Sequence, residues 1–572
     1  MSRNGKIVKF SEKLHEYEAG VSFEKRADGV CVLTGVADSW DKVVGAGMIA
    51  QKSGLFTGVV NNVKLRGVTE PPMKTPSFSD EKYNGMKTDV LVIGGGVVGC
   101  AILRELSALN LSCTLAEKEN DLGTHASMRN DGMVHVGMDI PGKPLKFLYM
   151  KRGNVMFDKL CSELQVKFYR NGQYVMFGDS RMKALIPPLW IRVRRHGIGK
   201  FRYVGQKEMR RKFPNISKKV KFALFFPETG TVCPYGLTVA LAENAVMNGA
   251  AVLLETAVTG MKTEKGEIKS VMTNRGEISA KVVINAAGVF CDKVADMAGD
   301  RFYTVHPRKG TSIITDKSFT DKIVRGNVAL LDNRLKSDKK SHTKGGGIVL
   351  TSDGNLLIGP DAHEVYARED YSVDIDDVKR VLKKQSVAVD EFPANAVINY
   401  FSGIRASLYN EDFIVEKGRA VKNIIHVAGI QSPGLTAAPA IAQDVAVMAK
   451  ELLEERGEKV EGKAFDPIRK TTPRLAEMPL CDREKYIKEN PDYGRIVCRC
   501  EEVSAGEIKD ALKSVIPPVT VDGVKRRVRA GMGRCQGGFC QPYVLEIMHE
   551  VTGKEYTEIP KKGEGVIITE IK

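Results

Sequence analysis

The chain has 572 residues, of which 43% are hydrophobic and 27% charged, and this length predicts about three to four domains. No apolar run reaches the ~18 residues of a membrane-spanning helix, and the N-terminus lacks the apolar core of a signal peptide. The net charge of +16 is spread along the chain without a nucleic-acid-binding motif. It therefore indicates either an excess of surface lysine or the attraction of an anionic substrate or an acidic partner.

Residues 1–65 are predicted to form a separate small α+β module. A helix is expected at Trp40–Lys52, with Asp38 or Ser39 as its N-cap. Three strands surround it, at Val21–Lys25, Val30–Val36 and Val59–Leu65. The module resembles BON-type modules, which implies contacts with membranes or partners; a purely structural appendage is the alternative. Prolines in residues 66–86 predict a linker.

A dinucleotide-binding motif follows the linker. The apolar run Val90–Ile93 predicts a buried strand, and it leads through a G-x-G-x-x-G motif into an apolar pattern at helical spacing. In this motif the first glycine makes the turn, the second admits a pyrophosphate to the helix N-terminus, and the third lets helix and strand pack closely: Gly94, Gly96 and Gly99. A second strand, Cys113–Ala116, ends in Glu117, whose carboxylate suits the ribose hydroxyls. The motif leaves NAD and FAD open.

Four later segments decide between these cofactors, namely Ser127–Gly137, Val282–Gly288, Phe401–Arg405 and Ala428–Thr436. They resemble the glycine- and D-amino-acid-oxidase-like FAD superfamily, and within it the branch of glycerol-3-phosphate and L-2-hydroxyglutarate dehydrogenases. The resemblance implies an α/β fold, with a discontinuous Rossmann-like FAD domain within residues 87–455. It also implies an antiparallel substrate domain at about residues 160–228 and 300–400. The FAD contacts that it implies, besides Gly94, Gly96, Gly99 and Glu117, are Ser127, Asn130, Gly132, Val258, Ala287, Gly288, Gly429, Gly434, Leu435 and Thr436.

The resemblance also implies the substrate site. Arg405 is the candidate handle for an anionic substrate, because a guanidinium grips phosphate or carboxylate bidentately. Lys344 is the candidate second cation, and Ser432 a hydroxyl donor. His135 is the candidate base or proton relay. For each of these residues, an ordinary structural role is the alternative.

Two positions depart from the pattern of the branch. His125 stands where a small residue is usual, and Asp131 where a serine or histidine is common. Asp131 would place a negative charge near an anionic substrate, or it could orient His135. His306 and His342, in the expected substrate domain, are reserve candidates for the base.

The C-terminal part carries four clustered cysteines. A proline-spaced linker, residues 456–493, precedes a module at 494–560 that contains a C-x-C pair and a C-x4-C pair: Cys498, Cys500, Cys535 and Cys540. Four thiolates are the usual ligands of a 2Fe–2S cluster, and the neighbouring glycines let backbone amides approach the sulfur atoms. The one-residue gap is cramped for structural zinc, which is the alternative together with free thiols. The chain has eleven cysteines in all, and their odd number fits a reducing cytoplasm rather than a disulfide framework.

With this BFD-like module, the chain resembles the A-subunit type of anaerobic glycerol-3-phosphate dehydrogenase. The resemblance implies oxidation of sn-glycerol 3-phosphate to dihydroxyacetone phosphate by FAD, with electrons passing through the cluster to a partner protein or a quinone pathway. The partner would be a second flavoprotein or an electron-transfer subunit, and through it the protein could lie at the inner face of the membrane. Three alternatives stay open: a dehydrogenase of a 2-hydroxy acid, a dehydrogenase of an amino acid or secondary amine, and a non-catalytic electron-transfer subunit.

Overall fold

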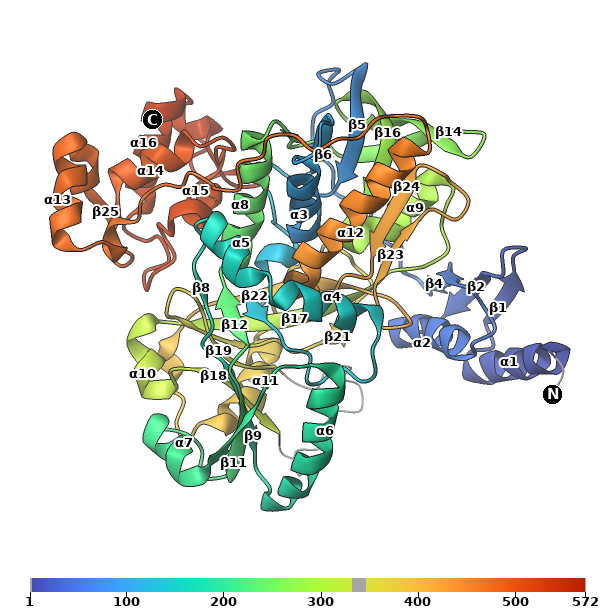
Figure 1. Ribbon diagram of the computed structural model, residues 1–572, viewed down its shortest axis with the longest axis horizontal. Helices are drawn as coiled ribbons and strands as arrows, with labels where there is room; N and C mark the ends of the chain where they lie inside the picture. The colour runs from blue at the N-terminus through green and yellow to red at the C-terminus, as the bar shows by residue number, and fades with distance from the viewer. Residues whose placement is uncertain (1–2, 332–345, 571–572) are drawn as a thin grey trace.

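The computed structural model describes residues 3–331 and 346–570, with the side chains of Arg3, Asn4 and Ser386 left aside. A central two-domain body carries a small module on either side (Figure 1). The N-terminal module and the C-terminal module lie at opposite sides of this body. In the described part of the chain, no helix is both long and apolar enough to cross a membrane.

The first central domain is built on an eight-stranded sheet. Its parallel part has the order β13-β6-β5-β16-β24, with bounds Ala251–Leu253, Cys113–Ala116, Met86–Ile93, Gly276–Asn285 and Ile424–Ala428. Antiparallel strands extend it, namely β14 (Val258–Glu264), β15 (Glu267–Thr273) and β23 (Ile414–Lys417). Strand β5 is fully apolar at its C-terminal end because both faces of the sheet are covered there.

Three helices pack together against one face of this sheet: α3 (Val97–Leu106), α8 (Pro234–Met247) and α12 (Gly434–Glu454). The helix α9 (Cys291–Ala298) joins the second hydrophobic cluster of the domain, with β14 and β16. The expected doubly covered Rossmann-like sheet is therefore present, and its strands end at the loops that carry the dinucleotide motif.

The second central domain has a nine-stranded sheet in the order β10-β11-β9-β18-β19-β20-β17-β21, with β22 paired to β17. Its strands are β9 (Gln173–Phe177), β10 (Arg202–Gly205), β11 (Phe222–Phe226), β17 (His306–Thr315), β18 (Asn327–Leu331), β19 (Gly347–Leu350), β20 (Leu356–Gly359), β21 (His363–Glu364) and β22 (Val397–Ser407). The sheet is antiparallel as expected, except that β9 and β18 run parallel. Strand β22 pairs along ten residues of β17, so it belongs to this sheet although its last residues were expected in the closing flavin segment.

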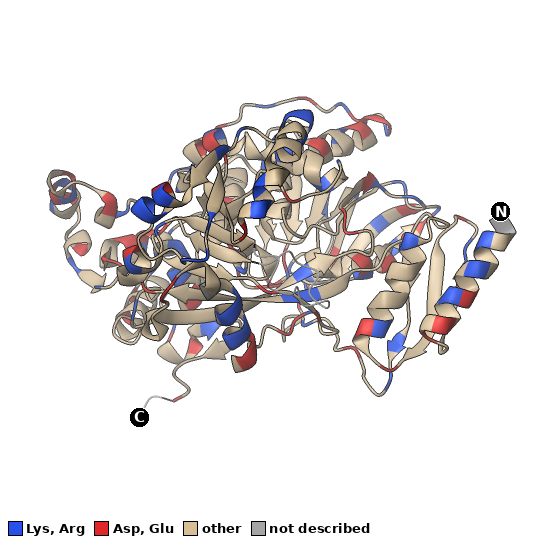
Figure 2. Ribbon diagram, turned by 90° about the horizontal axis from the view of Figure 1, so that it is seen from below, with Lys and Arg blue, Asp and Glu red and all other residues tan. Residues whose placement is uncertain are grey.

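The N-terminal module contains the predicted helix and strands, except that the strand expected at Val59–Leu65 is divided into two, and it has one further helix. Strands β1 (Val21–Lys25), β2 (Cys31–Ala37), β3 (Val59–Asn61) and β4 (Lys64–Leu65) accompany α2 (Trp40–Lys52). Ser39 is the N-cap of α2. Helix α1 (Arg3–Tyr17) is an addition, and both signs of charge follow its surface (Figure 2). Of its described side chains, only Phe10 and Leu14 are buried. This is too few apolar residues at helical spacing to predict the helix from the sequence.

This module packs directly on the central body. The Asn61 amide donates to the Tyr409 hydroxyl at 2.9 Å, and the Asn61 N–H donates to Thr304 Oγ1 at 2.9 Å. A Cβ at Gly47 of α2 would lie 2.3 Å from Tyr409 Cζ, so the helix backbone rests on this ring. The module therefore shares buried surface with the substrate domain.

The C-terminal module follows a segment that is more structured than the expected linker. That segment includes α13 (Leu480–Glu489), and it lies against the FAD domain, where Arg469 Nε donates to Glu243 Oε2 at 2.6 Å. The module itself holds β25 (Ile496–Cys498), β26 (Val503–Ser504), α14 (Ala505–Leu512), α15 (Val521–Val528) and α16 (Gln541–Thr552) around its own core.

Buried ion pairs hold this module against the central body. Asp121, 1% exposed, accepts hydrogen bonds from both Arg526 and Arg527 of α15. Arg529, also buried, pairs with Glu501 beside the cysteines at 2.8 Å and with Asp353 of the substrate domain at 2.7 Å. These contacts tie the cysteine module to both central domains.

We predict that Asp121→Asn loosens the docked module, because it leaves two guanidinium groups buried without a counter-charge, at a cost of about 3–5 kcal/mol. Amide hydrogen exchange in α15 should accelerate at neutral pH. Burial raises the pKa of Asp121, but Arg527 and then Arg526 lower it to about 2. The stabilisation is therefore present above the ordinary pKa of 3.8 and is lost as the pH falls through about 2.

The matched control is Asp482→Asn on α13, whose carboxylate is 46% exposed. It should leave exchange in α15 unchanged. Equal exchange rates in wild type and Asp121→Asn at neutral pH would contradict the proposed role of this ion pair.

Candidate active site

The glycine loop has the close contacts that its motif requires. Gly94 has a φ of +110°, and a Cβ there would lie 2.6 Å from the carbonyl oxygen of Ala286. A Cβ at Gly99 would lie 2.0 Å from the Gly94 carbonyl oxygen. Side chains at these positions would therefore collide with the backbone itself.

Gly96 has a different environment. It is the N-cap of α3, and the nearest described atom to a Cβ there is Ser127 Oγ at 3.2 Å. Ser127 Oγ also accepts the Val97 N–H at 2.8 Å. The open space lies at a helix N-terminus, which favours an anion such as a pyrophosphate. Residues present at this position therefore fit a bound dinucleotide.

Glu117 lies beside the glycine loop, where the adenosine ribose of a dinucleotide is expected. Its carboxylate accepts the Gly95 N–H at 2.6 Å and the Glu119 N–H at 2.9 Å, and its pKa is raised by burial. Each oxygen has only one of these bonds, so both keep acceptor capacity for ribose hydroxyls.

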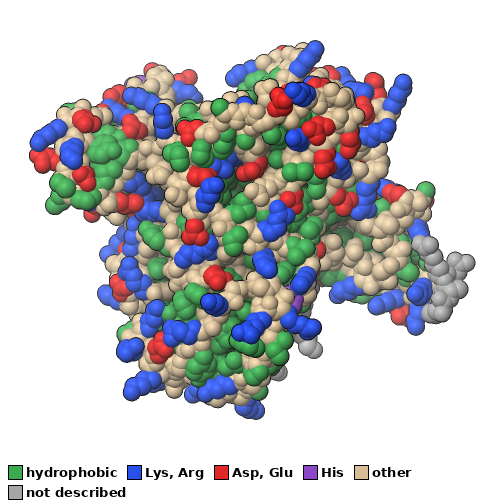
Figure 3. Space-filling view, viewed as in Figure 1, with side chains coloured by type: hydrophobic (Ala, Val, Ile, Leu, Met, Phe, Trp, Pro, Cys, Tyr) green, Lys and Arg blue, Asp and Glu red, His purple; other side chains and the backbone are tan. Residues whose placement is uncertain are grey.

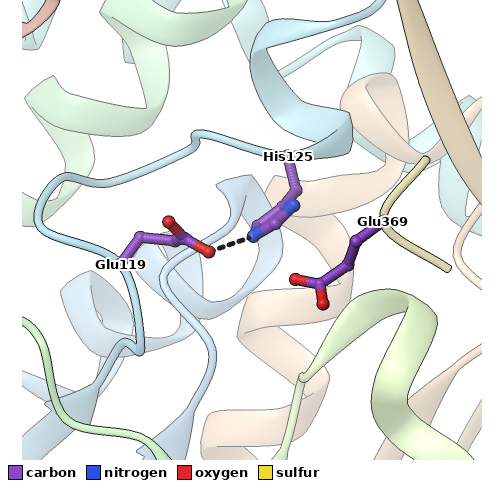
Figure 4. Close-up of side chains that lie close together, drawn as sticks. All are labelled: Glu119, His125 and Glu369. Atoms are coloured by element: carbon purple, nitrogen blue, oxygen red, sulfur yellow. Dashed lines mark hydrogen bonds and ion pairs between the residues drawn. The ribbon is translucent and has the colours of Figure 1, made fainter. Parts of the chain in front are cut away.

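His125, unexpected at its position, belongs to a network beside Glu117. Its Nε2 lies 2.8 Å from Glu119 Oε1, with Glu369 of the substrate domain nearby (Figure 4). Lys118 Nζ lies 2.6 Å from a carboxylate oxygen of both Glu119 and Glu369. Both acids therefore pair with the same lysine, and the network links the nucleotide loop to the substrate domain. Tyr371 completes it with a hydrogen bond to His125.

The loop after His125 connects the nucleotide motif to the substrate sheet. Asn130 braces it, since its Oδ1 accepts the Gly132 N–H at 2.9 Å and its amide donates to Ser127 O at 2.8 Å. Gly132 has a φ of +67°, and a Cβ there would lie 2.4 Å from the Val232 carbonyl oxygen. A Cβ at Gly403 of β22 would lie 2.4 Å from the Arg129 carbonyl oxygen.

The remaining expected cofactor positions border the same sheet ends. Val258 is buried in the cluster that also contains the end of β6, and Ala287 and Gly288 follow β16 beside Gly94. Gly429, with a φ of +70°, follows β24. The first residues of α12 complete the set: Gly434, Leu435 and Thr436. The fold therefore brings these segments to one edge of the sheet, although no ligand contact is shown for any of them.

Arg405 is the unusual charge of the site. Its Nη2 donates to the Asp361 carbonyl oxygen at 3.0 Å, whereas its Nη1 is buried without a hydrogen-bond partner among residues 3–331 and 346–570. Burial, and then the charge of Arg308, lower its pKa from the ordinary value of 12.5, while Asp131 acts in the opposite direction. An unpaired buried guanidinium nitrogen is costly, so this geometry suits an incoming anion.

The other expected catalytic residues differ in their burial and in their hydrogen bonds. His135 is half-buried; its N–H donates to Thr436 Oγ1 at 3.0 Å, and its carbonyl accepts from Asn154, which fixes the backbone at this position. Ser432 is exposed at the turn before α12. Lys344 and the reserve candidate His342 lie outside the described residues. Asp131 Oδ1 accepts the Met133 N–H, and in the described part of the chain no hydrogen bond joins it to the His135 ring.

A buried network beside Arg405 was not expected from the sequence. Arg308, directly opposite Arg405 in the pairing of β17 with β22, donates to Glu364 at 2.7 Å and to Glu411 at 2.6 Å. His306 Nδ1 lies 2.8 Å from the second oxygen of Glu364. Arg308 is therefore neutralised by carboxylates of the chain, unlike Arg405. The alternation of His306 and Arg308 along one strand was the only available signal, because the carboxylates come from distant segments.

The four cysteines of the C-terminal module converge as two pairs. Cys500 Sγ lies 3.8 Å from Cys535 Sγ, and a hydrogen bond with Cys540 lowers the pKa of Cys498 to about 6. Burial raises the pKa of Cys535, but backbone amides of Gly537 and Phe539 outweigh it and lower that pKa. These amides stabilise a thiolate, which is the form that binds iron. The arrangement fits four cluster ligands, with one pair buried and the other accessible.

We predict that Gly96→Ala yields folded protein with little or no FAD, because the new Cβ meets only Ser127 Oγ in the protein but occupies the space beside the helix N-terminus. Flavin absorbance after purification measures this loss. Gly205→Ala, where a Cβ would lie 3.8 Å from the nearest atom, is the control and should keep its flavin. Stoichiometric flavin in Gly96→Ala would show that the cofactor lies elsewhere.

Comparisons with known proteins agree with this geometry. Residues 89–448 match the family described as FAD dependent oxidoreductase, and residues 496–550 match the BFD-like [2Fe-2S] binding domain. The chain is 37% identical over 482 residues to a glycerol 3-phosphate dehydrogenase of Caloramator mitchellensis, covering 84% of this chain and 98% of that protein. It is 23% identical over 499 residues to the A-type subunit of the anaerobic glycerol-3-phosphate dehydrogenase of Escherichia coli K12, covering 80% and 87%.

Solved structures show the same fold. The FAD-bound L-alpha-glycerophosphate oxidase of Mycoplasma pneumoniae superposes with a TM-score of 0.59 at 23% identity, covering 67% of this chain and 98% of that one. The L-proline dehydrogenase of P. horikoshii gives a TM-score of 0.55 at 21% identity, covering 65% and 99%. The dinucleotide loop, the substrate sheet and the paired cysteines thus have a common explanation: the chain belongs to the FAD-dependent oxidoreductase family and carries a BFD-like 2Fe–2S domain.

Proposed function

We propose that this oxidoreductase oxidises the secondary alcohol of sn-glycerol 3-phosphate to dihydroxyacetone phosphate. The observation that carries the proposal is the Arg405 guanidinium, whose Nη1 is buried and lacks a partner among the described residues. A phosphate or carboxylate of the substrate would supply that partner. The names of the relatives favour the phosphate: the Caloramator protein, matched over nearly its full length, is a glycerol 3-phosphate dehydrogenase.

In this proposal each residue has one task. Arg405 binds the substrate anion and fixes the position of the reacting carbon, while Lys344 provides a second cation for the phosphate dianion and Ser432 donates a hydrogen bond. His135 takes the hydroxyl proton, and the hydrogen bonds of its backbone to Thr436 and Asn154 hold it in place. FAD, when bound, supplies the hydride acceptor of the reaction.

The cysteine module indicates where the electrons go. We propose Cys498, Cys500, Cys535 and Cys540 as the ligands of the 2Fe–2S cluster, a one-electron carrier. Its accessible pair of thiols favours delivery to a second protein, either another flavoprotein or an electron-transfer subunit. The relative from E. coli is named as one subunit of its enzyme, which supports such a partner. We place the protein in the cytoplasm, with its partner at the inner face of the membrane.

The substrate anion can be tested with paired variants. Arg405→Ala should raise the KM for any anionic substrate by about 30-fold or more, because one partner of a desolvated charge pair is worth roughly 2–5 kcal/mol. Lys344→Ala should raise KM to a similar extent only for a phosphate. Anaerobic flavin bleaching by glycerol 3-phosphate, L-2-hydroxyglutarate, L-lactate and proline measures both effects. An effect of Arg405 alone would indicate a hydroxy acid or amino acid, and no effect at either position would contradict the site.

The proton acceptor gives a separate prediction. His135→Ala should lower kcat by roughly 100- to 10,000-fold with little change in KM, because a general base acts on the chemical step. Rapid mixing under anaerobic conditions measures the rate of flavin reduction directly. His306→Ala is the comparison: its Nδ1 is engaged by Glu364. A larger loss of kcat in His306→Ala than in His135→Ala would assign the base to His306.

A further inference from the structure

Helix α6 (Ile186–His196) shows apolar side chains to solvent at one end of the substrate domain. Leu185 is 53% exposed, Trp190 47% and Ile191 52%. Its inner face is already packed, since Ile186, Leu189 and Val193 join the hydrophobic clusters below it. Burial of the helix against its own domain therefore does not explain the outer apolar face, and such faces mark interaction surfaces. We refer to the exposed part of residues 180–203 as the α6 surface.

Positive charge gathers on the same segment. Residues 180–207 contain eight lysines and arginines and no aspartate or glutamate, and at the two ends of this segment Arg181 pairs with Asp179 and Arg202 with Glu208. The sequence predicts a positive charge that is distributed along the chain, and this prediction is wrong for this segment. In Figure 3 the lower lobe, where Figure 1 places α6, shows apolar side chains bordered mainly by basic ones.

The apolar and basic groups are interleaved rather than separated. The Arg194 guanidinium lies 3.8 Å from the Trp190 ring centroid. Lys183 Nζ lies 5.8 Å from the ring of Tyr203, which is 43% exposed and extends the surface to β10. A tryptophan with a cation over its ring suits a boundary between an apolar phase and an anionic, hydrated one.

We propose that the α6 surface binds the anionic surface of a lipid bilayer. Leu185, Trp190 and Ile191 would enter the boundary between headgroups and acyl chains, while Arg194 and Arg195 would reach the anionic headgroups. Charge complementarity argues for this occupant, because a segment without acidic residues has no charge for the basic groups of an ordinary protein partner to pair with. The inference goes beyond the oxidation reaction and would place the substrate domain on the membrane without any spanning helix.

The test uses the purified full-length protein with FAD and cluster, and vesicles of phosphatidylcholine with or without phosphatidylglycerol. Trp40 and Trp190 are the two tryptophans of the chain, so a Trp40→Phe background makes Trp190 the only reporter. Anionic vesicles should sediment the protein, shift Trp190 emission to the blue, and permit its quenching by brominated acyl chains. Neutral vesicles and high salt should weaken all three signals.

Substitutions on α6 test whether the α6 surface is the part of the protein that binds the vesicles. Arg194→Gln with Arg195→Gln should weaken vesicle binding by roughly 30-fold. Ile191→Ser should weaken it by roughly tenfold. The matched control, Lys485→Gln with Lys488→Gln on α13, removes the same charge from side chains that are 75% and 73% exposed, and should bind like wild type. Flavin reduction by substrate in solution should be unchanged in all of these variants, which separates this inference from the proposed reaction.

Three outcomes would overturn the proposal: no binding to anionic vesicles, binding that the α6 variants do not weaken, or Trp190 emission that brominated lipids leave unquenched. A protein that ignores vesicles but binds immobilised polyglutamate through Arg194 and Arg195 would show that the surface docks an acidic protein instead.

Discussion

The proposed substrate site depends on Arg405, a half-buried residue whose Nη1 is buried and has no hydrogen-bond partner among the described residues. The pairing of β17 with β22 places Arg308 opposite Arg405, so two positive charges share one buried face of the substrate sheet. Glu364 and Glu411 neutralise Arg308. Arg405 donates to the Asp361 carbonyl, and the carboxylates of Asp131, Asp361 and Glu364 act on it only from a distance, while its Nη1 is unpaired within the described residues. Such a charge is tolerated in a folded protein when a ligand completes its coordination.

The difference between the two arginines also explains how the site can be selective. Because Arg308 is held by two carboxylates, an incoming anion gains little by approaching it, and the attraction is concentrated at Arg405. Asp131 opposes the anion at the same place, so a substrate must offer enough negative charge to prevail. A phosphate satisfies this condition better than a carboxylate, because it can carry two negative charges.

The loop from Ser127 to His135 connects the segments expected at the cofactor to those expected at the substrate. Ser127 Oγ accepts the Val97 N–H of the helix at which the pyrophosphate is expected, and the Arg129 backbone lies against Gly403 in the strand that carries Arg405. His135 is joined to the first turn of α12 through Thr436. Three segments distant in sequence therefore contact the same loop, and a displacement of any of them would move His135 relative to Arg405.

Sequence patterns within a single segment predicted the turns, helices and strands that this segment forms. The nucleotide loop, the helix Trp40–Lys52 and the strand Cys113–Ala116 follow from glycine spacing, capping and apolar runs, and the structure contains them. The sheet order, the carboxylates around Arg308 and the Lys118 network could not be predicted, because their members are brought together only by tertiary pairing. The roles of Arg405 and His135 came from resemblance and the cluster ligands from the spacing of the cysteines, and all of them stay predictions.

The position of the cysteine module extends the same reasoning to electron transfer. Domains joined by a tether move freely unless their interface is strong, and here the interface contains two buried ionic clusters, around Asp121 and Arg529. Arg529 connects Glu501, next to Cys500, to Asp353 in the substrate domain. The cysteines are thereby fixed relative to the central body, while Cys500 stays exposed and Phe539, 81% exposed, stands beside Cys540. A fixed inner contact with an open outer edge is the arrangement expected of a one-way relay, in which the donor is always in place and the acceptor arrives from solution.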